Sequence, residues 1–244
     1  MDWTGLPASV IGGIIGAFAG GLPAWLLAKR QSDEALRRDR ETRTAAEKVL
    51  AFKINVKLLT IINNTIHDWC HFHRSLALLK EPATQHMEPW QAVRPIIGHT
   101  DADILHFDAE ELAIFMAAKE RQFLSDLIVL AQRHATSIMV MREYCSQREA
   151  LKARSPHPEN MDGDIAQAMI TDEERMKLLP YTRPLNGMVV QMVAAADENI
   201  RLGREVAGRI RSIFQAYFGD DAAGGPSFPT DSELEALLAD SSSD

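Results

Sequence analysis

A long run without a single charged side chain, at residues 5–28, constrains this chain more than any other feature. It reads GLPASVIGGIIGAFAGGLPAWLLA. At a rise of about 1.5 Å per residue, a helix of this length matches the hydrocarbon core of a bilayer, which is roughly 30 Å thick. Lys29 and Arg30 follow immediately. The run predicts a transmembrane anchor over residues 1–28, with the rest of the chain outside the bilayer.

The charges that flank the run predict its orientation. Basic residues gather on the C-terminal side, from Lys29 to Arg43, and none precedes the run. The positive-inside rule then places the C-terminal part in the cytoplasm and the short N-terminus outside, as in a single-pass protein of the bacterial inner (plasma) membrane. A cleaved signal peptide is disfavoured, because the segment before the run carries Asp2 and no Lys or Arg, and the apolar residues continue well past 17–19, where cleavage would fall.

Glycines mark one side of the predicted anchor. Gly12, Gly16 and Gly20 are four residues apart, and Gly13 and Gly21 belong to the neighbouring row. Such rows of small residues let a second helix approach closely, so they predict self-association or docking on a partner transmembrane helix. The alternative is that glycine is simply common in membrane helices.

The next twenty residues, 29–48, are highly charged and contain neither proline nor glycine. Acidic residues precede basic ones by four positions, as in Glu34 and Arg38, and such pairs stabilise a solvated helix. This segment is predicted to be a helical stalk that leaves the membrane.

Apolar residues then recur at helical spacing in three stretches, at 49–79, 108–153 and 163–218. No segment has convincing strand character. The sequence therefore predicts an all-α fold, in which one N-terminal transmembrane helix continues into a cytoplasmic antiparallel bundle of long helices at 49–218.

Local signals indicate where these helices begin and end. Asp108 and Glu111 have the spacing of a capping box at the start of the second stretch. Prolines 180 and 184 are expected to split the third stretch into two helices. The segment 82–107 contains three prolines and a glycine, and is expected to be loop-like with a short helical turn or two.

Composition limits the classes of partner and chemistry. The net charge is −8 and the pI is about 5.5, whereas nucleic-acid-binding proteins are usually basic, so no nucleic-acid partner is expected. Two cysteines are too few for a disulfide scaffold and suit a reducing compartment.

After residue 218 the chain becomes acidic and rich in Gly, Ser and Asp, so 219–244 is predicted to be a disordered tail. Within it, residues 232–239 place Leu234, Leu237 and Leu238 on one side of a potential short helix. This segment is either a docking peptide for a cytoplasmic protein partner or an ordinary tail that happens to contain three leucines.

The densest group of potential metal ligands is His67, Cys70 and His71. Imidazole and thiolate are ligands for zinc and other transition metals, and the two histidines are four apart on one helical face. No second pair of ligands has a standard spacing, so two solvated histidines and a packed cysteine are the stronger interpretation. No phosphate-binding loop, dinucleotide fingerprint or HExxH motif is present, and no catalytic residue or cofactor is predicted.

These observations lead to three hypotheses. The first is a membrane-anchored, non-enzymatic interaction or scaffolding protein that forms homo-oligomers through its transmembrane face. The second is an oligomeric pore-forming or membrane-perturbing protein, although the run has no charged residue to line a water-filled lumen. The third is a metal-binding enzyme or sensor built on His67, Cys70 and His71.

Overall fold

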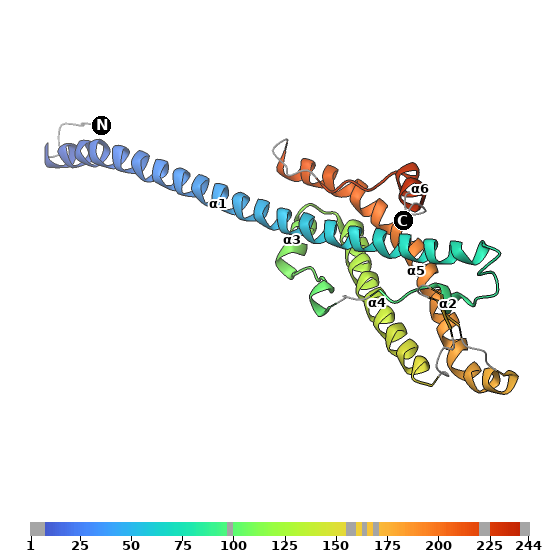
Figure 1. The fold of residues 1–244 in the computed structure, drawn as a ribbon. Coiled ribbons are helices and arrows are strands. Elements are labelled where there is room, and N and C mark those ends of the chain that lie inside the picture. Colours follow the sequence, from blue (N-terminus) through green and yellow to red (C-terminus); the bar gives the residue numbers. More distant parts are fainter. Residues whose placement is uncertain are drawn as a thin grey trace. The chain divides into compact units, whose positions relative to one another are not determined.

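The structure is a computed structural model that describes residues 8–96, 100–154, 160–162, 165–167, 171–219 and 225–239, with only the backbone given for 8–22, 160–162 and 165–167. It is mainly helical and begins with one long helix, α1, so the all-α prediction is confirmed at that level (Figure 1). The chain divides into two units, Met1–Val49 and Leu50–Asp244. The helices are α1 (Ala8–Ala77), α2 (Pro89–Ala92), α3 (Ala109–Ala117), α4 (Arg121–Lys152), α5 (Asp172–Phe218) and α6 (Asp231–Ala239), with short 3-10 turns η1 (Leu78–Lys80) and η2 (Asp101–Asp103).

Helix α1 runs without interruption through the predicted anchor, the stalk and the first helical stretch. In the stalk, Arg38 pairs with Glu34 at 2.6 Å and Arg43 pairs with Glu47 at 3.1 Å. These ion pairs are exposed, so each contributes little stability on its own. Their repetition along the helix, together with the absence of glycine and proline, explains why this solvated segment is helical.

The unit Leu50–Asp244 has an apolar core made of two clusters. The first joins α1, α3, α4 and α5, and its largest fully buried side chains include Phe115, Phe123 and Phe214. The Phe115 ring lies 4.9 Å from Phe123 and 5.8 Å from Phe214 between ring centroids, the favourable range for aromatic pairs. The second cluster joins α1, α2, α4 and α5 around Phe72, Val93, Met141, Tyr144, Leu151, Leu185 and Val189.

The predicted second stretch, 108–153, is two helices rather than one. Its start is as expected, because the Asp108 N–H donates to the Glu111 carboxylate at 2.8 Å. Helix α3 then ends where Lys119 adopts a left-handed conformation with φ 63°, and the Glu120 N–H donates to the Phe115 carbonyl. This is the hydrogen-bond pattern of a Schellman cap, formed here without glycine. The break lies between Phe115 and Phe123, which both pack in the first cluster.

The third stretch was expected to split at its prolines and to begin near 163, and both expectations are wrong. Helix α5 is continuous from Asp172 to Phe218, with Pro180 and Pro184 inside it. The two prolines are exposed and one turn apart, so the carbonyl groups that lose their N–H donors lie on the solvent side, where water can satisfy them. Leu185 packs on the opposite, buried side and holds the helix in place.

Residues before α5 form a small hairpin, in which strand β1 (Asn160–Asp162) pairs antiparallel with β2 (Ile165–Gln167). The sequence predicted no strand. Helix α5 begins at a capping box, because Thr171 accepts from the Glu174 N–H at 3.3 Å and donates to the Glu174 carboxylate at 2.9 Å. Backbone and side-chain hydrogen bonds from Thr171 lower the pKa of Glu174.

The segment 82–107 is mostly irregular with short helical turns, as predicted, and α4 holds it in place. The Tyr144 hydroxyl donates to the backbone carbonyls of Trp90 at 2.8 Å and Val93 at 2.7 Å, and Arg148 donates to the same two carbonyls. Burial raises the pKa of Tyr144. A neutral phenol in this position satisfies backbone acceptors that would otherwise be buried without donors.

The C-terminal segment differs from the predicted disordered tail. Residues 225–239 are described and pack on the other helices of the unit Leu50–Asp244, which we call the helical unit. Residues 220–224 and 240–244 lie outside the described residues. The Phe228 ring contacts the first cluster and lies where Gly203 of α5 leaves room, since a β-carbon at Gly203 would meet that ring at 3.1 Å. Arg204 forms an ion pair with Asp231 at 2.6 Å. Of the three leucines predicted to share one side of this segment, Leu234 is 4% exposed, whereas Leu237 is 40% exposed.

Leu234→Ala is expected to release the C-terminal segment. Truncating a buried leucine costs about 2–5 kcal/mol, which is large for a segment held by few side chains. Amide hydrogen exchange should become faster throughout 225–239 while α4 keeps its protection. The matched control is Leu237→Ala, because Leu237 is 40% exposed and should change exchange little. Equal acceleration in both variants would contradict a specific role for Leu234.

Candidate functional site

The predicted metal-binding residues contact different neighbours. His67 Nδ1 lies 3.5 Å from Asp68 Oδ1, and hydrogen bonding to Asp68 raises the pKa of His67. Cys70 is buried, and burial raises the pKa of its thiol, which disfavours the thiolate that binds metals. His71 Nε2 lies 2.7 Å from the Arg94 carbonyl, so this nitrogen carries a proton, and burial lowers the pKa of the ring. Among the described residues, no group of three or more His, Cys, Asp or Glu side chains could hold a metal ion.

The glycines of the predicted anchor all lie on α1, but their surroundings lie outside the described part of the chain. Within the described residues, one helix is long and apolar enough to cross a membrane by length and composition, namely Pro23–Lys80, which comprises part of α1 and the turn η1. Part of that stretch packs in the helical unit, where Ile54, Leu58 and Ile61 are fully buried. The case for an anchor therefore rests on the charge-free run at 5–28.

Between the two apolar clusters lies a set of polar side chains from three helices, which we call the polar layer. It consists of Thr65 and Asp68 of α1, His134 and Ser137 of α4, and Asn199 of α5. Thr65, Asp68, His134 and Asn199 are all at least nine-tenths buried. Each helix thus presents apolar residues to the core on both sides of the layer and polar residues within it.

The polar layer surrounds a cavity of about 320 Å³. Its apolar walls include Phe72, Val140 and Met192. Arg133 and Glu198 also line it, form an ion pair with each other, and are partly exposed. A volume of this size lies at the lower end of the range for small-molecule pockets.

Hydrogen bonds fix most of the groups in the layer. Thr65 Oγ1 donates to the Ile61 carbonyl at 2.8 Å, and Ser137 Oγ donates to the Arg133 carbonyl at 3.0 Å. Asn199 Nδ2 donates to Ser137 Oγ at 3.2 Å, but Asn199 Oδ1 has no hydrogen-bond partner in the part of the chain that the structure describes. A buried amide carbonyl without a donor costs about 1–3 kcal/mol.

The imidazole of His134 has a polar neighbour on α1. His134 Nε2 lies 3.4 Å from Asn64 Nδ2. With that amide nitrogen as donor, Nε2 is the acceptor of this contact. Asp68 is then the acidic group within the layer.

A second candidate surface is an apolar stripe on the outside of α1. Phe52, Val56 and Leu59 are 62%, 48% and 44% exposed, although they lie on the same helix as the buried core residues. Their spacing of four and then three residues follows one face of a helix and is that of a coiled-coil seam. We call these three residues the outer stripe.

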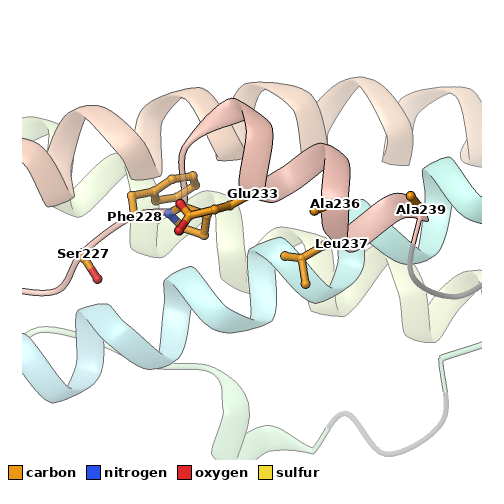
Figure 2. Close-up of a pocket in the computed structure, with 7 residues that line it drawn as sticks. Ser227, Phe228, Glu233, Ala236, Leu237 and Ala239 are labelled. Atoms are coloured by element: carbon orange, nitrogen blue, oxygen red, sulfur yellow. The ribbon is translucent and has the colours of Figure 1, made fainter.

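The C-terminal segment forms a third feature, a groove beside α6. Figure 2 shows its lining residues, which include Phe228, Glu233 and Leu237. Glu233 bonds to Thr230 and so caps α6, with its carboxylate 2.7 Å from the Thr230 nitrogen. The polar atoms of this groove thus serve the local structure of the segment that forms it.

The polar layer was not predicted from the sequence, although polar residues at core positions of apolar stripes could have indicated it. In α4, His134 occupies a core position of the stripe that contains Leu127, Leu130 and Ile138. In α5, Asn199 follows Ala196 at the same kind of position. A polar residue inside a buried stripe is unusual, and two such interruptions in two helices are a recognisable pattern.

Comparison with known proteins gives no relative: no family model matches the chain, and no match is found to a curated protein or to a solved structure. The function is therefore inferred from the chain's own residues.

Proposed function

We propose that this protein is a membrane-anchored, non-enzymatic helical adaptor that forms homo-oligomers through α1. The charge-free run at 5–28 is the anchor, and the basic flank places the helical unit, an antiparallel bundle of α1, α4 and α5, in the cytoplasm. Anchoring confines copies of the protein to two dimensions and raises their effective concentration, so a weak contact between copies suffices for assembly.

The observation that carries this proposal is the outer stripe. Its three large apolar side chains, spaced about one turn apart, are between 44% and 62% exposed, although the same helix buries Ile54, Leu58 and Ile61 in the core. Burying such a side chain contributes about 1.5–3 kcal/mol. A second copy of α1 supplies an apolar helix of the same pitch, and parallel alignment is natural for chains anchored by the same end.

The small-residue face of the anchor supports the same assembly within the membrane. Gly12, Gly16 and Gly20, with Gly13 and Gly21 beside them, would let two anchors approach closely. Copies of the adaptor would then associate through two parts of α1, the glycine rows in the lipid and the outer stripe in the cytoplasm.

Phe52→Glu is expected to weaken self-association at least about a hundredfold, since two phenylalanine side chains per dimer lose their burial. The full chain in detergent or nanodiscs should be measured by light scattering coupled to size exclusion and by a dilution series with fluorescently labelled copies. The wild-type protein should be oligomeric, and the variant should be monomeric at the same concentration.

The matched control is Val190→Glu. Val190 is an exposed apolar residue of α5, at 64%, and lies outside the outer stripe. This variant should keep the wild-type oligomeric state and show the same far-UV circular dichroism as Phe52→Glu. A monomeric wild-type protein, or an identical dilution curve for Phe52→Glu, would refute the proposal.

A further inference from the structure

The C-terminal segment, residues 225–239, is held on α1 and α5 through two apolar anchors. The Phe228 ring lies where Gly203 of α5 leaves room, at the seam with α1, because a β-carbon at Gly203 would also come within 4.0 Å of Ile62. Leu234, six residues later, is 4% exposed. Most other residues of α6 are exposed. An aromatic and an aliphatic anchor with exposed residues between them are typical of a bound peptide.

The backbone of the segment also fits the surface of α5 closely. A β-carbon at Gly225 would meet Ile210 Cγ2 at 2.8 Å and the Arg211 backbone nitrogen at 3.2 Å. A glycine of the segment thus makes room for α5, and Gly203 of α5 makes room for the segment. The two surfaces therefore match in shape on both sides of the contact.

The charges of the segment and of the surface beneath it are opposite. Residues 225–239 contain three acidic residues and neither Lys nor Arg. At the start of α6, Arg204 pairs with Asp231 at 2.6 Å and lies 5.5 Å from the centre of the Phe228 ring. Near the end of α6, Arg74 of α1 donates to the Leu237 carbonyl. Arginines at both ends of α6 therefore favour an acidic peptide in this orientation.

These two arginines have donors that the segment does not use. The Nε atoms of Arg74 and Arg204 are buried and have no hydrogen-bond partner in the part of the chain that the structure describes. A guanidinium group is satisfied best by a carboxylate that accepts from two of its nitrogens at once. A peptide with a carboxylate in such a position would bind donors that the chain's own segment leaves unpaired.

We propose that the surface beneath the C-terminal segment binds an acidic peptide of a partner protein, in which a phenylalanine precedes a leucine by six residues. The chain's own segment occupies this surface until the partner displaces it. We call this surface the docking surface, and it consists of Ile62 and Arg74 of α1 and Gly203, Arg204, Ile210 and Arg211 of α5. A tethered segment has a high effective concentration, so the partner competes by binding more tightly or by being concentrated at the membrane.

The test uses the full chain in detergent with Phe228→Ala/Leu234→Ala, which removes both anchors of the chain's own segment. The probe is a fluorescein-labelled peptide with the sequence of residues 225–239, followed by fluorescence anisotropy. It should bind this variant saturably, with one site per chain. Binding to the wild-type chain should be at least about tenfold weaker, because its docking surface is occupied.

Two further peptides test the chemistry of the partner. One keeps the phenylalanine, the leucine and the three acidic residues and has alanine or glutamine elsewhere, and it should bind within about tenfold of the first peptide. The other keeps the original sequence but has lysine at the three acidic positions. It should lose at least about tenfold in affinity, because its charge repels the arginines of the docking surface.

Substitutions in the docking surface should have a matched effect. In the Phe228→Ala/Leu234→Ala background, Gly203→Leu fills the space for the phenylalanine ring and should abolish peptide binding. The control is Gly187→Leu, another substitution within α5, because a β-carbon at Gly187 would meet no atom within 4 Å. It should bind the peptide as its parent does. The proposal does not depend on oligomer formation through α1, so adding Phe52→Glu should also leave peptide binding unchanged.

Four results would overturn the proposal. Absence of saturable binding to Phe228→Ala/Leu234→Ala, or unchanged binding after Gly203→Leu, would show that no peptide docks on this surface. Loss of helical circular dichroism in Phe228→Ala/Leu234→Ala would show that the segment is an integral part of the fold rather than an exchangeable occupant. Loss of the wild-type oligomeric state in that variant would identify a second copy of the chain as the occupant.

Discussion

Deletion of residues 1–28 is expected to move the protein from the membrane pellet to the soluble fraction after ultracentrifugation. The deleted segment contains the charge-free run, which is long enough to cross the hydrocarbon core. The next segment, 29–48, is strongly charged and mostly exposed, so it cannot replace the anchor. The effect should be all or none, and fractionation followed by immunoblotting measures it.

A matched control replaces residues 5–28 by an alternating Leu/Ala run of the same length. This variant should stay in the pellet, because membrane insertion depends on length and hydrophobicity rather than on the particular residues. It should also lose the glycine rows, so any drop in self-association would report on the anchor face. A full-length protein that remains soluble, or a C-terminal reporter that is active only in the periplasm, would contradict the proposed topology.

Lys57→Met is expected to lower the free energy of unfolding by about 3–5 kcal/mol. Lys57 Nζ lies 2.8 Å from Glu111 Oε2, and the Glu111 side chain is only 1% exposed. The same ammonium group donates to the His106 carbonyl at 2.8 Å. Without Lys57 the Glu111 carboxylate stays buried without its cation, which is costly in a medium of low dielectric constant. Urea titration of the full chain in detergent, followed by circular dichroism, measures the change.

A second substitution should recover much of this loss. In Lys57→Met/Glu111→Gln the buried charge is gone, while the glutamine oxygen can still accept from the Asp108 N–H that caps α3. The double variant should be more stable than the single one by more than half of the difference. Lys53→Met, an exposed neighbour on α1, should leave stability unchanged within about 0.5 kcal/mol. A double variant as unstable as Lys57→Met would show that the contact to the His106 carbonyl dominates.

The parts of the fold that the sequence predicted correctly depend on neighbouring residues. The capping box of Asp108 and Glu111 is a contact over three residues, and the short helix within 232–239 follows from the helical spacing of its leucines. The helical spacing of apolar residues at 49–79 was also recognisable in the sequence, and Ile54, Leu58 and Ile61 of that stretch are buried. Such features are visible because a helix converts sequence distance directly into position on a face.

The predictions that were wrong all concern features that depend on contacts between residues far apart in the sequence. The prolines at 180 and 184 favour a break locally, but burial of Leu185 against other helices holds α5 together. The sequence has no glycine at Lys119 that would indicate a helix end. The helix nevertheless ends there, and Phe115 and Phe123 on either side of the break pack in one cluster. The acidic composition of the C-terminal segment suggests disorder, and the space left at Gly203 for the Phe228 ring cannot be inferred from composition.

The sequence by itself determined the charge-free run, its basic flank, the charged stalk and the helical character of the chain. Each of these depends on composition or on residues within one or two turns of each other, where geometry is nearly fixed. Only the tertiary structure decided that the polar residues of α1, α4 and α5 meet around one cavity and that the C-terminal segment packs on α5. It also decided that the outer stripe stays exposed in the part of the chain that the structure describes. Those outcomes depend on which helix faces pack together, because burial of a side chain is a property of all its neighbours in space rather than of its neighbours in sequence.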